Sequence, residues 1–279
     1  MQKKGVVILD FGSQYTQLIA RRVRELNVYS EILSSNTHLS QIIERDPSAI
    51  ILSGGPSSVF GDEAPSFDKK IFDIDIPILG ICYGLQLLAH HHGGLVESNG
   101  QGEYGFSEIE IDDDKKLFQN VSKSSQVWMS HMDRVSKLPD GWHTLAHSSN
   151  GVIAAMANKN QTRVATQFHP EVVHSKEGKN ILKNFLFNIS NCSANWTAEN
   201  IVEQKVKLIR EKVGESNILV GVSGGVDSTV VAALIHKAVG PQCNAVLIDH
   251  GLLRKDEAKN CVTALKEGLG VNIYCYNES

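Results

Sequence analysis

Short apolar runs that alternate with helical stretches are the feature that most constrains the fold of this chain. In the first part, the apolar runs are 6–9, 48–52 and 77–80, and the helical stretches are 14–25 and 85–92. Parallel strands need long crossover connections, which are usually helices, so this alternation predicts an α/β protein with an open parallel sheet. Ser13 is expected to cap the first helix.

The pattern changes farther along the chain. Between residues 103 and 167 the strand candidates are closely spaced, which predicts partly antiparallel pairing before a closing helix at 178–190. A second α/β unit then follows, with expected strands at 217–223, 244–249 and 271–276 and expected helices at 198–213, 228–239 and 257–269. We expect a domain at 1–190, a linker at 191–200 and a second domain at 201–279. Three parallel strands would leave bare sheet edges, so the second domain is expected to be the truncated first part of a larger one.

Composition limits the class of protein. The 279 residues carry a formal net charge of −4, with 42% hydrophobic and 21% charged residues. These values favour a soluble globular protein and give no basic surplus for nucleic-acid binding. No apolar run is long enough to span a bilayer. Because the cysteines are scattered and odd in number, with no C-x-x-C pair, we expect a cytoplasmic protein with no nucleic-acid or membrane partner.

A cysteine flanked by glycines follows the third apolar run. Gly80-Ile81-Cys82-Tyr83-Gly84 is the thiol form of the nucleophile elbow, in which a sharp strand-to-helix turn presents the central side chain above the sheet. The helix N-terminus favours a thiolate there. The elbow predicts Cys82 as a nucleophile, but these five residues alone leave a buried structural cysteine open as the alternative.

Two further stretches supply partners for Cys82. His169 and Glu171 are two residues apart, so in an extended segment they face the same way and the carboxylate can orient the imidazole. Gly54-Gly55 exposes backbone N–H groups that suit an oxyanion. Taken singly, these stretches also fit a loop histidine and an ordinary glycine turn.

Together, LSGGPSS (52–58), GICYGLQLL (80–88) and QFHPE (167–171) resemble, in the same order, the motifs of class-I (triad-type) glutamine amidotransferases. The fold that this implies is an open, flavodoxin-like or hydrolase-like sheet. The implied reaction is glutamine hydrolysis through a γ-glutamyl thioester, without a cofactor. The implied site residues are the triad Cys82, His169 and Glu171, an oxyanion hole at Gly55 and Tyr83, and Gln86 as a glutamine-binding residue.

A second glycine loop follows the strand expected at 217–223. It reads Ser223-Gly224-Gly225-Val226-Asp227-Ser228-Thr229, and the N–H groups at such a helix start suit a pyrophosphate. The lysine of a Walker A loop is missing. A carboxylate in a phosphate loop repels the ligand unless a cation lies between them, so Asp227 is a candidate Mg²⁺ ligand. The alternative is a well-capped helix after a glycine turn.

This loop resembles the ATP-binding loop of N-type ATP pyrophosphatases, which have a Rossmann-like domain. An amidotransferase domain followed by such a loop resembles the family of glutamine-hydrolysing GMP synthases. VWMSHMDRV (127–135) is similar to that family's glutamine-site strand, which implies Ser130 and Asp133 as glutamine-binding residues, Asp133 pairing with the ammonium. LIDHGLLRKDEA (247–258) is similar to its adenine-side segment, although His250 stands where an asparagine or a similar residue is common.

The resemblance implies that the small molecules bound are glutamine, XMP and ATP with Mg²⁺, and that ammonia displaces AMP from adenylated XMP. Members of that family run far past residue 279, into much of the XMP site and a dimerisation region. We therefore expect a full-length homodimer, and a chain that hydrolyses glutamine but does not complete GMP synthesis. Three alternatives stay open: another triad-type amidotransferase, a nucleotide-binding module with a decayed glutaminase, and a γ-glutamyl hydrolase.

The consecutive histidines at 90–92 are the remaining conspicuous feature. Consecutive helix positions point in different directions, so these side chains cannot converge on one metal ion. They predict a solvated helix end.

Overall fold

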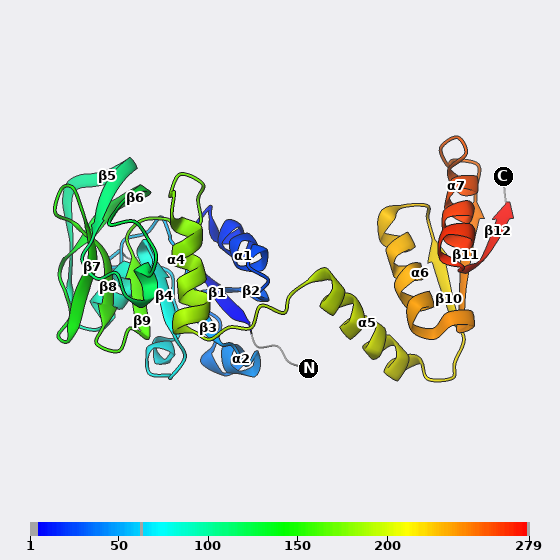
Figure 1. Cartoon of the computed structure of the whole chain (residues 1–279), viewed down its shortest axis with the longest axis horizontal. Coiled ribbons are helices and arrows are strands. Elements are labelled where there is room, and N and C mark those ends of the chain that lie inside the picture. The colour runs from blue at the N-terminus through cyan, green and yellow to red at the C-terminus, as the bar shows by residue number, and fades with distance from the viewer. Residues whose placement is uncertain (1–4, 62–63, 278–279) are drawn as a thin grey trace. The chain divides into compact units, whose positions relative to one another are not determined.

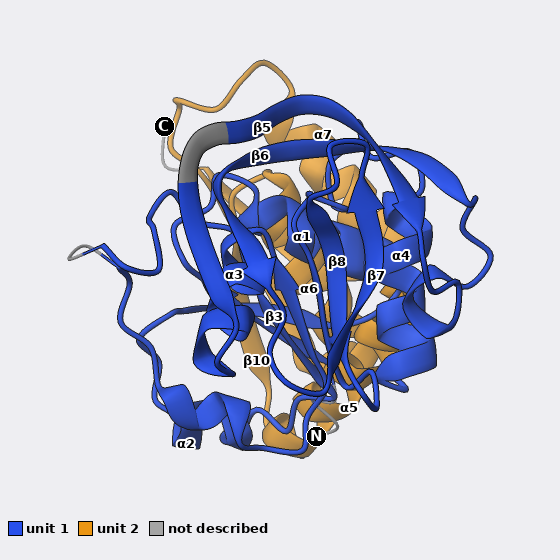
Figure 2. Cartoon of the chain, turned by 90° about the vertical axis from the view of Figure 1, so that its left-hand side faces the viewer, with its two compact units in different colours: residues 1–196 blue, residues 197–279 orange. Residues whose placement is uncertain are grey.

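The computed structural model describes residues 5–61 and 64–277, with the side chains at 99–101 left out of the description. It forms two compact units, unit 1 (residues 1–196) and unit 2 (residues 197–279), which Figure 1 shows by element and Figure 2 by colour. Each unit has its own sheet and its own hydrophobic core.

Unit 1 is built on a nine-stranded sheet with the order β2-β1-β3-β4-β9-β8-β7-β5-β6. The strands from β2 to β9 in that order are parallel neighbours, and the pairs from β9 to β6 are antiparallel. The strands are β1 (Val6–Asp10), β2 (Ser30–Ser34), β3 (Ala49–Leu52), β4 (Ile78–Ile81), β5 (Leu95–Ile111), β6 (Ser124–Lys137), β7 (Trp142–Ser148), β8 (Ile153–Asn158) and β9 (Arg163–Thr166). The expected open parallel sheet with an antiparallel region is confirmed.

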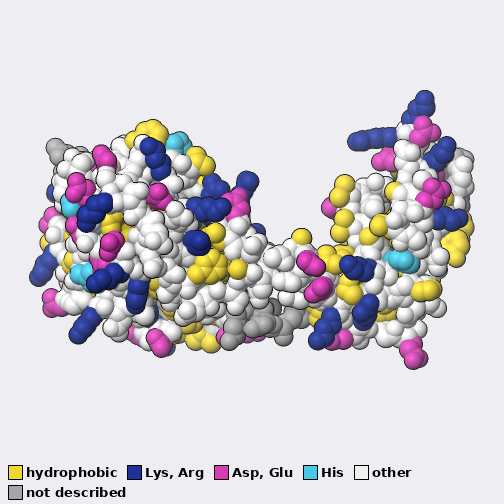
Figure 3. Space-filling model, in the orientation of Figure 1, with side chains coloured by type: hydrophobic (Ala, Val, Ile, Leu, Met, Phe, Trp, Pro, Cys, Tyr) yellow, Lys and Arg dark blue, Asp and Glu magenta, His cyan; other side chains and the backbone are white. Residues whose placement is uncertain are grey.

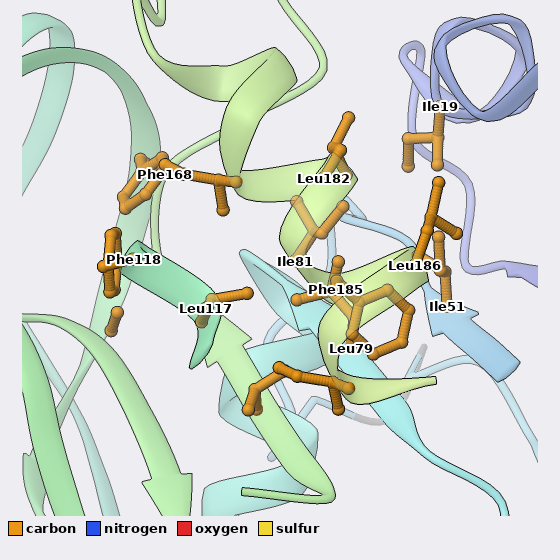
Figure 4. Close-up of a cluster of buried hydrophobic side chains, with 14 of the residues drawn as sticks. Ile19, Ile51, Leu79, Ile81, Leu117, Phe118, Phe168, Leu182, Phe185 and Leu186 are labelled. Atoms are coloured by element: carbon orange, nitrogen blue, oxygen red, sulfur yellow. The ribbon is translucent and has the colours of Figure 1, made fainter. Parts of the chain in front are cut away.

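Helices cover both faces of this sheet because successive strand residues point to opposite sides. Ile8 and Ile51 pack in one cluster with α1 and α4, and Figure 4 shows Ile19 and Leu182 on these helices. Leu52 packs in a second cluster with α2 and α3. The helices of unit 1 are α1 (Thr16–Glu25), α2 (Leu39–Glu44), α3 (Tyr83–His91) and α4 (Gly178–Asn184), which a π turn extends over Phe185–Ile189; short 3₁₀ turns lie at Lys69–Phe72 and Lys116–Phe118.

Unit 2 has three parallel strands in the order β10-β11-β12. Its elements are α5 (Ala198–Val213), β10 (Ile218–Val222), α6 (Val226–Val239), a 3₁₀ turn (Gly240–Gln242), β11 (Cys243–Asp249), α7 (Glu257–Thr263) with a π turn (Ala264–Gly268), and β12 (Asn272–Asn277). Val220 and Leu247 lie in its core, whereas Leu219, Ile248 and Tyr274 are exposed, and Figure 3 shows hydrophobic side chains on the surface of this unit. None of the described helices combines the length and the apolar character that crossing a membrane requires.

Three predicted helix starts are wrong. Helix α3 begins at Tyr83, two residues before the predicted start at Leu85. Helix α1 begins at Thr16, and Ser13 does not cap it, because its Oγ accepts a hydrogen bond from the Tyr15 N–H inside the preceding turn. Helix α6 begins at Val226 with Gly225 at the N-cap position. Asp227 therefore lies in the first turn of the helix instead of before it.

The prediction for the histidines at 90–92 is also wrong in part. The His91 ring packs against Phe72 with ring centroids 4.4 Å apart, and the His92 ring packs against Trp142 at 5.2 Å. Burial in this aromatic cluster lowers the pKa of both histidines. The His90 ring packs against Phe60 with ring centroids 5.0 Å apart, so all three rings are packed against aromatic side chains instead of being simply solvated.

Candidate active site

The carboxyl ends of four neighbouring parallel strands, β1, β3, β4 and β9, meet at one edge of the sheet in unit 1. Ligand sites of open α/β sheets lie at this edge. A cavity of about 610 Å³ is found here. Among its lining residues are six that the sequence predicted, namely Gly55, Cys82, Gln86, Ser130, Asp133 and His169.

Cys82 occupies a strained turn between β4 and α3. Its backbone has φ of +52° and ψ of −100°, a conformation that residues with a side chain rarely adopt. The turn is tight: a Cβ at Gly80 would lie 2.5 Å from the backbone of Gly84, and a Cβ at Gly84 would lie 2.6 Å from the carbonyl oxygen of Leu52. The two glycines thus allow the close approach of strand and helix that brings the sulfur to the cavity.

His169 connects Cys82 to a buried carboxylate. Its Nδ1 lies 2.8 Å from Glu171 Oε1, and His169 and Cys82 line the same cavity. Burial by itself would lower the pKa of His169, but the charge of Glu171 and hydrogen bonds to Cys82 and Glu171 raise it well above the ordinary histidine value. The three side chains predicted from distant segments therefore form one connected set.

Glycines also shape the wall opposite His169. A Cβ at Gly54 would lie 3.0 Å from His169 Cε1, and a Cβ at Gly55 would lie 2.6 Å from the Phe11 carbonyl oxygen and 3.4 Å from Tyr83 Cγ. Tyr83 is the first residue of α3, where the backbone N–H has no acceptor within the helix. Gly55 and Tyr83 are thus close to each other and to the elbow.

The residues expected to bind glutamine lie on α3 and β6. Gln86 Nε2 donates a hydrogen bond to the Asp133 carbonyl oxygen at 2.9 Å. Ser58 Oγ donates to Asp133 Oδ2 at 2.6 Å. The backbone carbonyl of Ser130 accepts a hydrogen bond from the Cys82 thiol at 3.5 Å. The side-chain amide of Gln86 is thus bonded to the backbone of another predicted site residue.

Sequence reasoning missed two residues that touch the triad. Gln167 is fully buried, and its Nε2 donates to Cys82 Sγ at 3.8 Å. Its spacing was a usable signal, because Gln167 precedes His169 by two residues, just as His169 precedes Glu171. The Tyr15 ring packs edge-on against the His169 ring with centroids 5.0 Å apart, and nothing in the sequence near Tyr15 indicated this contact.

The glycine loop of unit 2 is held by short-range hydrogen bonds. Ser228 Oγ accepts from the Ser223 N–H at 3.1 Å, and Thr229 Oγ1 donates to the Gly225 carbonyl oxygen at 2.8 Å. Gly224 has φ of +82°, and Asp227 is exposed. Within the described residues, no group of three or more His, Cys, Asp and Glu side chains is placed to hold a metal ion. One carboxylate in the first turn of a helix fits Mg²⁺ that takes most of its ligands from phosphates and water.

The comparison with protein families decides the identity of unit 1. Residues 7–189, more than half of the chain, match the model for class-I glutamine amidotransferases. The chain belongs to the class-I glutamine amidotransferase family. Residues 198–277 match the model described as NAD synthase.

This amidotransferase is similar to curated GMP synthases over nearly its whole length. It is 49% identical to the glutamine-hydrolysing GMP synthase of Brachyspira hyodysenteriae over 268 residues, which are 96% of this chain and 52% of the relative. It is 48% identical to that of Fusobacterium nucleatum over 278 residues, which are 99% of this chain and 54% of the relative. The chain therefore spans about half the length of these relatives.

A solved structure supports the same family. A candidate GMP synthase subunit from Thermoplasma acidophilum is 30% identical, with a TM-score of 0.60, and the match covers 65% of this chain and 92% of that one. The predicted resemblance of this amidotransferase to GMP synthases is confirmed, and so is the predicted class of fold.

Proposed function

We propose that unit 1 hydrolyses L-glutamine to glutamate and ammonia. One observation carries this proposal: Cys82, in its strained elbow, lines one cavity together with His169, whose Nδ1 lies 2.8 Å from the fully buried Glu171. This is the order of nucleophile, base and orienting carboxylate found in catalytic triads. The raised pKa of His169 favours an imidazolium beside the sulfur, which stabilises a thiolate.

In the first half of the reaction, the Cys82 thiolate attacks the side-chain amide carbon of glutamine. The oxyanion accepts hydrogen bonds from the N–H groups of Gly55 and Tyr83, and His169 protonates the departing ammonia, which leaves a γ-glutamyl thioester. In the second half, His169 takes a proton from water, and the hydroxide attacks the thioester. Glutamate leaves, and the proton returns to the Cys82–His169 pair.

The residues on α3 and β6 bind and orient glutamine. The Asp133 carboxylate pairs with the α-ammonium group, and its position is supported by the hydrogen bond from Ser58. Gln86 and Ser130 line the same cavity and complete the glutamine-binding set. Because Gln86 donates to the Asp133 backbone, it supports binding in part through Asp133.

We further propose that unit 2 is the first part of an ATP pyrophosphatase domain. Residues 223–229 would hold the pyrophosphate of ATP, and Asp227 would hold Mg²⁺ between itself and the phosphates. The complete protein would use ATP and ammonia to convert XMP to GMP, as the resemblance to glutamine-hydrolysing GMP synthases implies. The five free cysteines support a reducing, cytoplasmic location. The homodimer stays a prediction from the resemblance.

Glutamate release from L-glutamine by the purified chain tests the proposal for unit 1. We expect Cys82→Ala to lower the rate at least about 10³-fold, because the covalent route is lost. Cys275→Ser is the matched control, since Cys275 is an exposed cysteine in unit 2, and it should leave the rate unchanged. Equal release by the Cys82→Ala variant would refute the proposal.

A further inference from the structure

A buried histidine–glutamate pair lies beside the cavity, outside the triad. His131 on β6 and Glu103 on β5 are directly opposite each other in the antiparallel register. Their side chains are 1% and 11% exposed, and His131 Nε2 lies 3.3 Å from Glu103 Oε2. The other ring nitrogen, Nδ1, lies 3.0 Å from the carbonyl oxygen of Asp133. The pair therefore reaches the backbone of the residue proposed to bind the substrate's ammonium group.

Each ring nitrogen of His131 faces an acceptor on a neighbouring residue. A carbonyl oxygen only accepts hydrogen bonds, so Nδ1 donates to Asp133, and Nε2 faces the Glu103 carboxylate. The hydrogen bond from His131 lowers the pKa of Glu103; burial opposes this, and hydrogen bonds from Asn150 and Ser148 add to it. A hydrogen bond to an ionised carboxylate is stronger than one between neutral groups, so Glu103 holds the His131 ring in place.

The carbonyl oxygen of Asp133 is thereby held from two sides. His131 Nδ1 donates from within β6, and Gln86 Nε2 donates from α3, the helix that begins just after Cys82. A carbonyl oxygen has two lone pairs, and both are used here. Ser58 Oγ fixes the Asp133 carboxylate at 2.6 Å. The position of Asp133 relative to the nucleophile thus depends on the Glu103–His131 pair.

We propose that Glu103 and His131 are positioning residues that set Asp133 to bind the α-ammonium group of glutamine, and so make the cavity specific for an amino acid over a simple amide. This inference rests on the proposed glutaminase function. The pair acts through Asp133 and does not touch the reacting atoms. Its loss should therefore weaken binding of a substrate that carries the ammonium group and spare the chemical step.

Comparing L-glutamine with glutaramate, which has the same amide and carboxylate but no α-amino group, tests this directly. We expect Glu103→Gln to raise KM for L-glutamine about tenfold, with kcat changed less than about twofold. The kcat/KM for glutaramate should stay unchanged, so that discrimination between the two compounds falls about tenfold. If turnover of glutaramate is too slow to measure, the same ratio comes from the affinities of the two compounds for the Cys82→Ala chain.

Two further variants keep the test decisive. Ser148→Ala removes one hydrogen bond to Glu103, 2.9 Å long, and should shift discrimination in the same direction by a smaller factor even if Glu103→Gln fails to fold. Asp112→Asn disrupts the comparable but exposed pair with His147 and should change nothing. Unchanged discrimination in the Glu103 and Ser148 variants, or an equal loss of kcat/KM for both compounds, overturns this inference alone. A wild-type chain that releases no glutamate overturns the proposed function and the inference with it.

Discussion

The two loops proposed to bind substrates have the same local plan but are held in opposite ways. Each follows a parallel strand and opens a helix. Cys82 is 3% exposed, and its sulfur contacts Ser130 and Gln167, which are 48 and 85 residues away in sequence. The loop at 223–229 is largely exposed, and the hydrogen bonds of its serine and threonine side chains join residues at most five positions apart.

The difference between long-range and local contacts determines what each loop can do. Long-range contacts bury Cys82 and His169 together. Burial by itself lowers the pKa of His169, and the charge of Glu171 beside it raises that pKa well above the ordinary value. Such tuning is what a nucleophile and its base need. In the loop of unit 2 the backbone of Gly224 contacts the buried Cys261, and the side chains of the loop are held by local hydrogen bonds. We infer that unit 1 holds the groups for chemistry and that this part of unit 2 holds groups for binding.

Among the variants that test this difference between the two loops, Glu171→Gln should change kcat the most. The change removes the charge that helps to keep the proton on His169, so kcat should fall about 10²-fold. A raised pKa means that His169 keeps its proton, and hence its ability to protonate ammonia, to a higher pH than an ordinary histidine of pKa about 6.5. The alkaline limb of kcat should therefore lie above that value in the wild type and move to lower pH in the variant.

The pH dependence of glutamate release in both proteins measures this shift. Glu177→Gln is a suitable control, since that carboxylate is close in sequence but bonded to Asn180 instead of the triad. An alkaline limb at the same pH in the wild type and in Glu171→Gln would show that the buried carboxylate does not set the protonation of His169.

A smaller effect is expected in the exposed loop for Asp227→Asn. With Mg²⁺ present, loss of the carboxylate should weaken pyrophosphate binding about fivefold, because an exposed charge contributes only about 1 kcal/mol. Without Mg²⁺, the variant should bind pyrophosphate more tightly than the wild type, since the repelling charge is gone. Glutamate release should be the same in both proteins.

Calorimetric titration of pyrophosphate into the wild-type and variant chains, with Mg²⁺ and then with a chelator, measures this reversal. A variant that binds more weakly under both conditions would assign Asp227 to the structure of the loop instead of to a cation. A change in glutamate release would contradict the assignment of chemistry to unit 1.

The sequence predicted the parts of the site that depend on local chain geometry. The elbow around Cys82 follows from two flanking glycines after an apolar strand, and the pairing of His169 with Glu171 follows from a spacing of two in an extended segment. The alternation of strands and helices likewise predicted the parallel sheet of unit 1. Each of these features can be predicted from a short stretch of the sequence.

What could not be predicted depends on register and on contacts between distant segments. Glu103 meets His131 because β5 and β6 pair in one particular antiparallel register, with an irregularity between Ser98 and Glu103. Helix α1 begins later than predicted because the hydroxyl of Ser13 accepts a hydrogen bond from the nearby Tyr15 N–H instead of capping the helix. Competing local hydrogen bonds of this kind shift helix starts by one or two residues.

Covalent trapping tests directly whether Cys82 is the nucleophile. The chain is incubated with 6-diazo-5-oxo-L-norleucine, an electrophilic analogue of glutamine, and the modified peptide is identified by mass spectrometry. We expect one adduct, on the peptide that contains Cys82. Excess L-glutamine should prevent its formation, and His169→Ala should slow it. An adduct confined to Cys275 or another cysteine, or a Cys82 peptide that stays unmodified, would contradict this expectation.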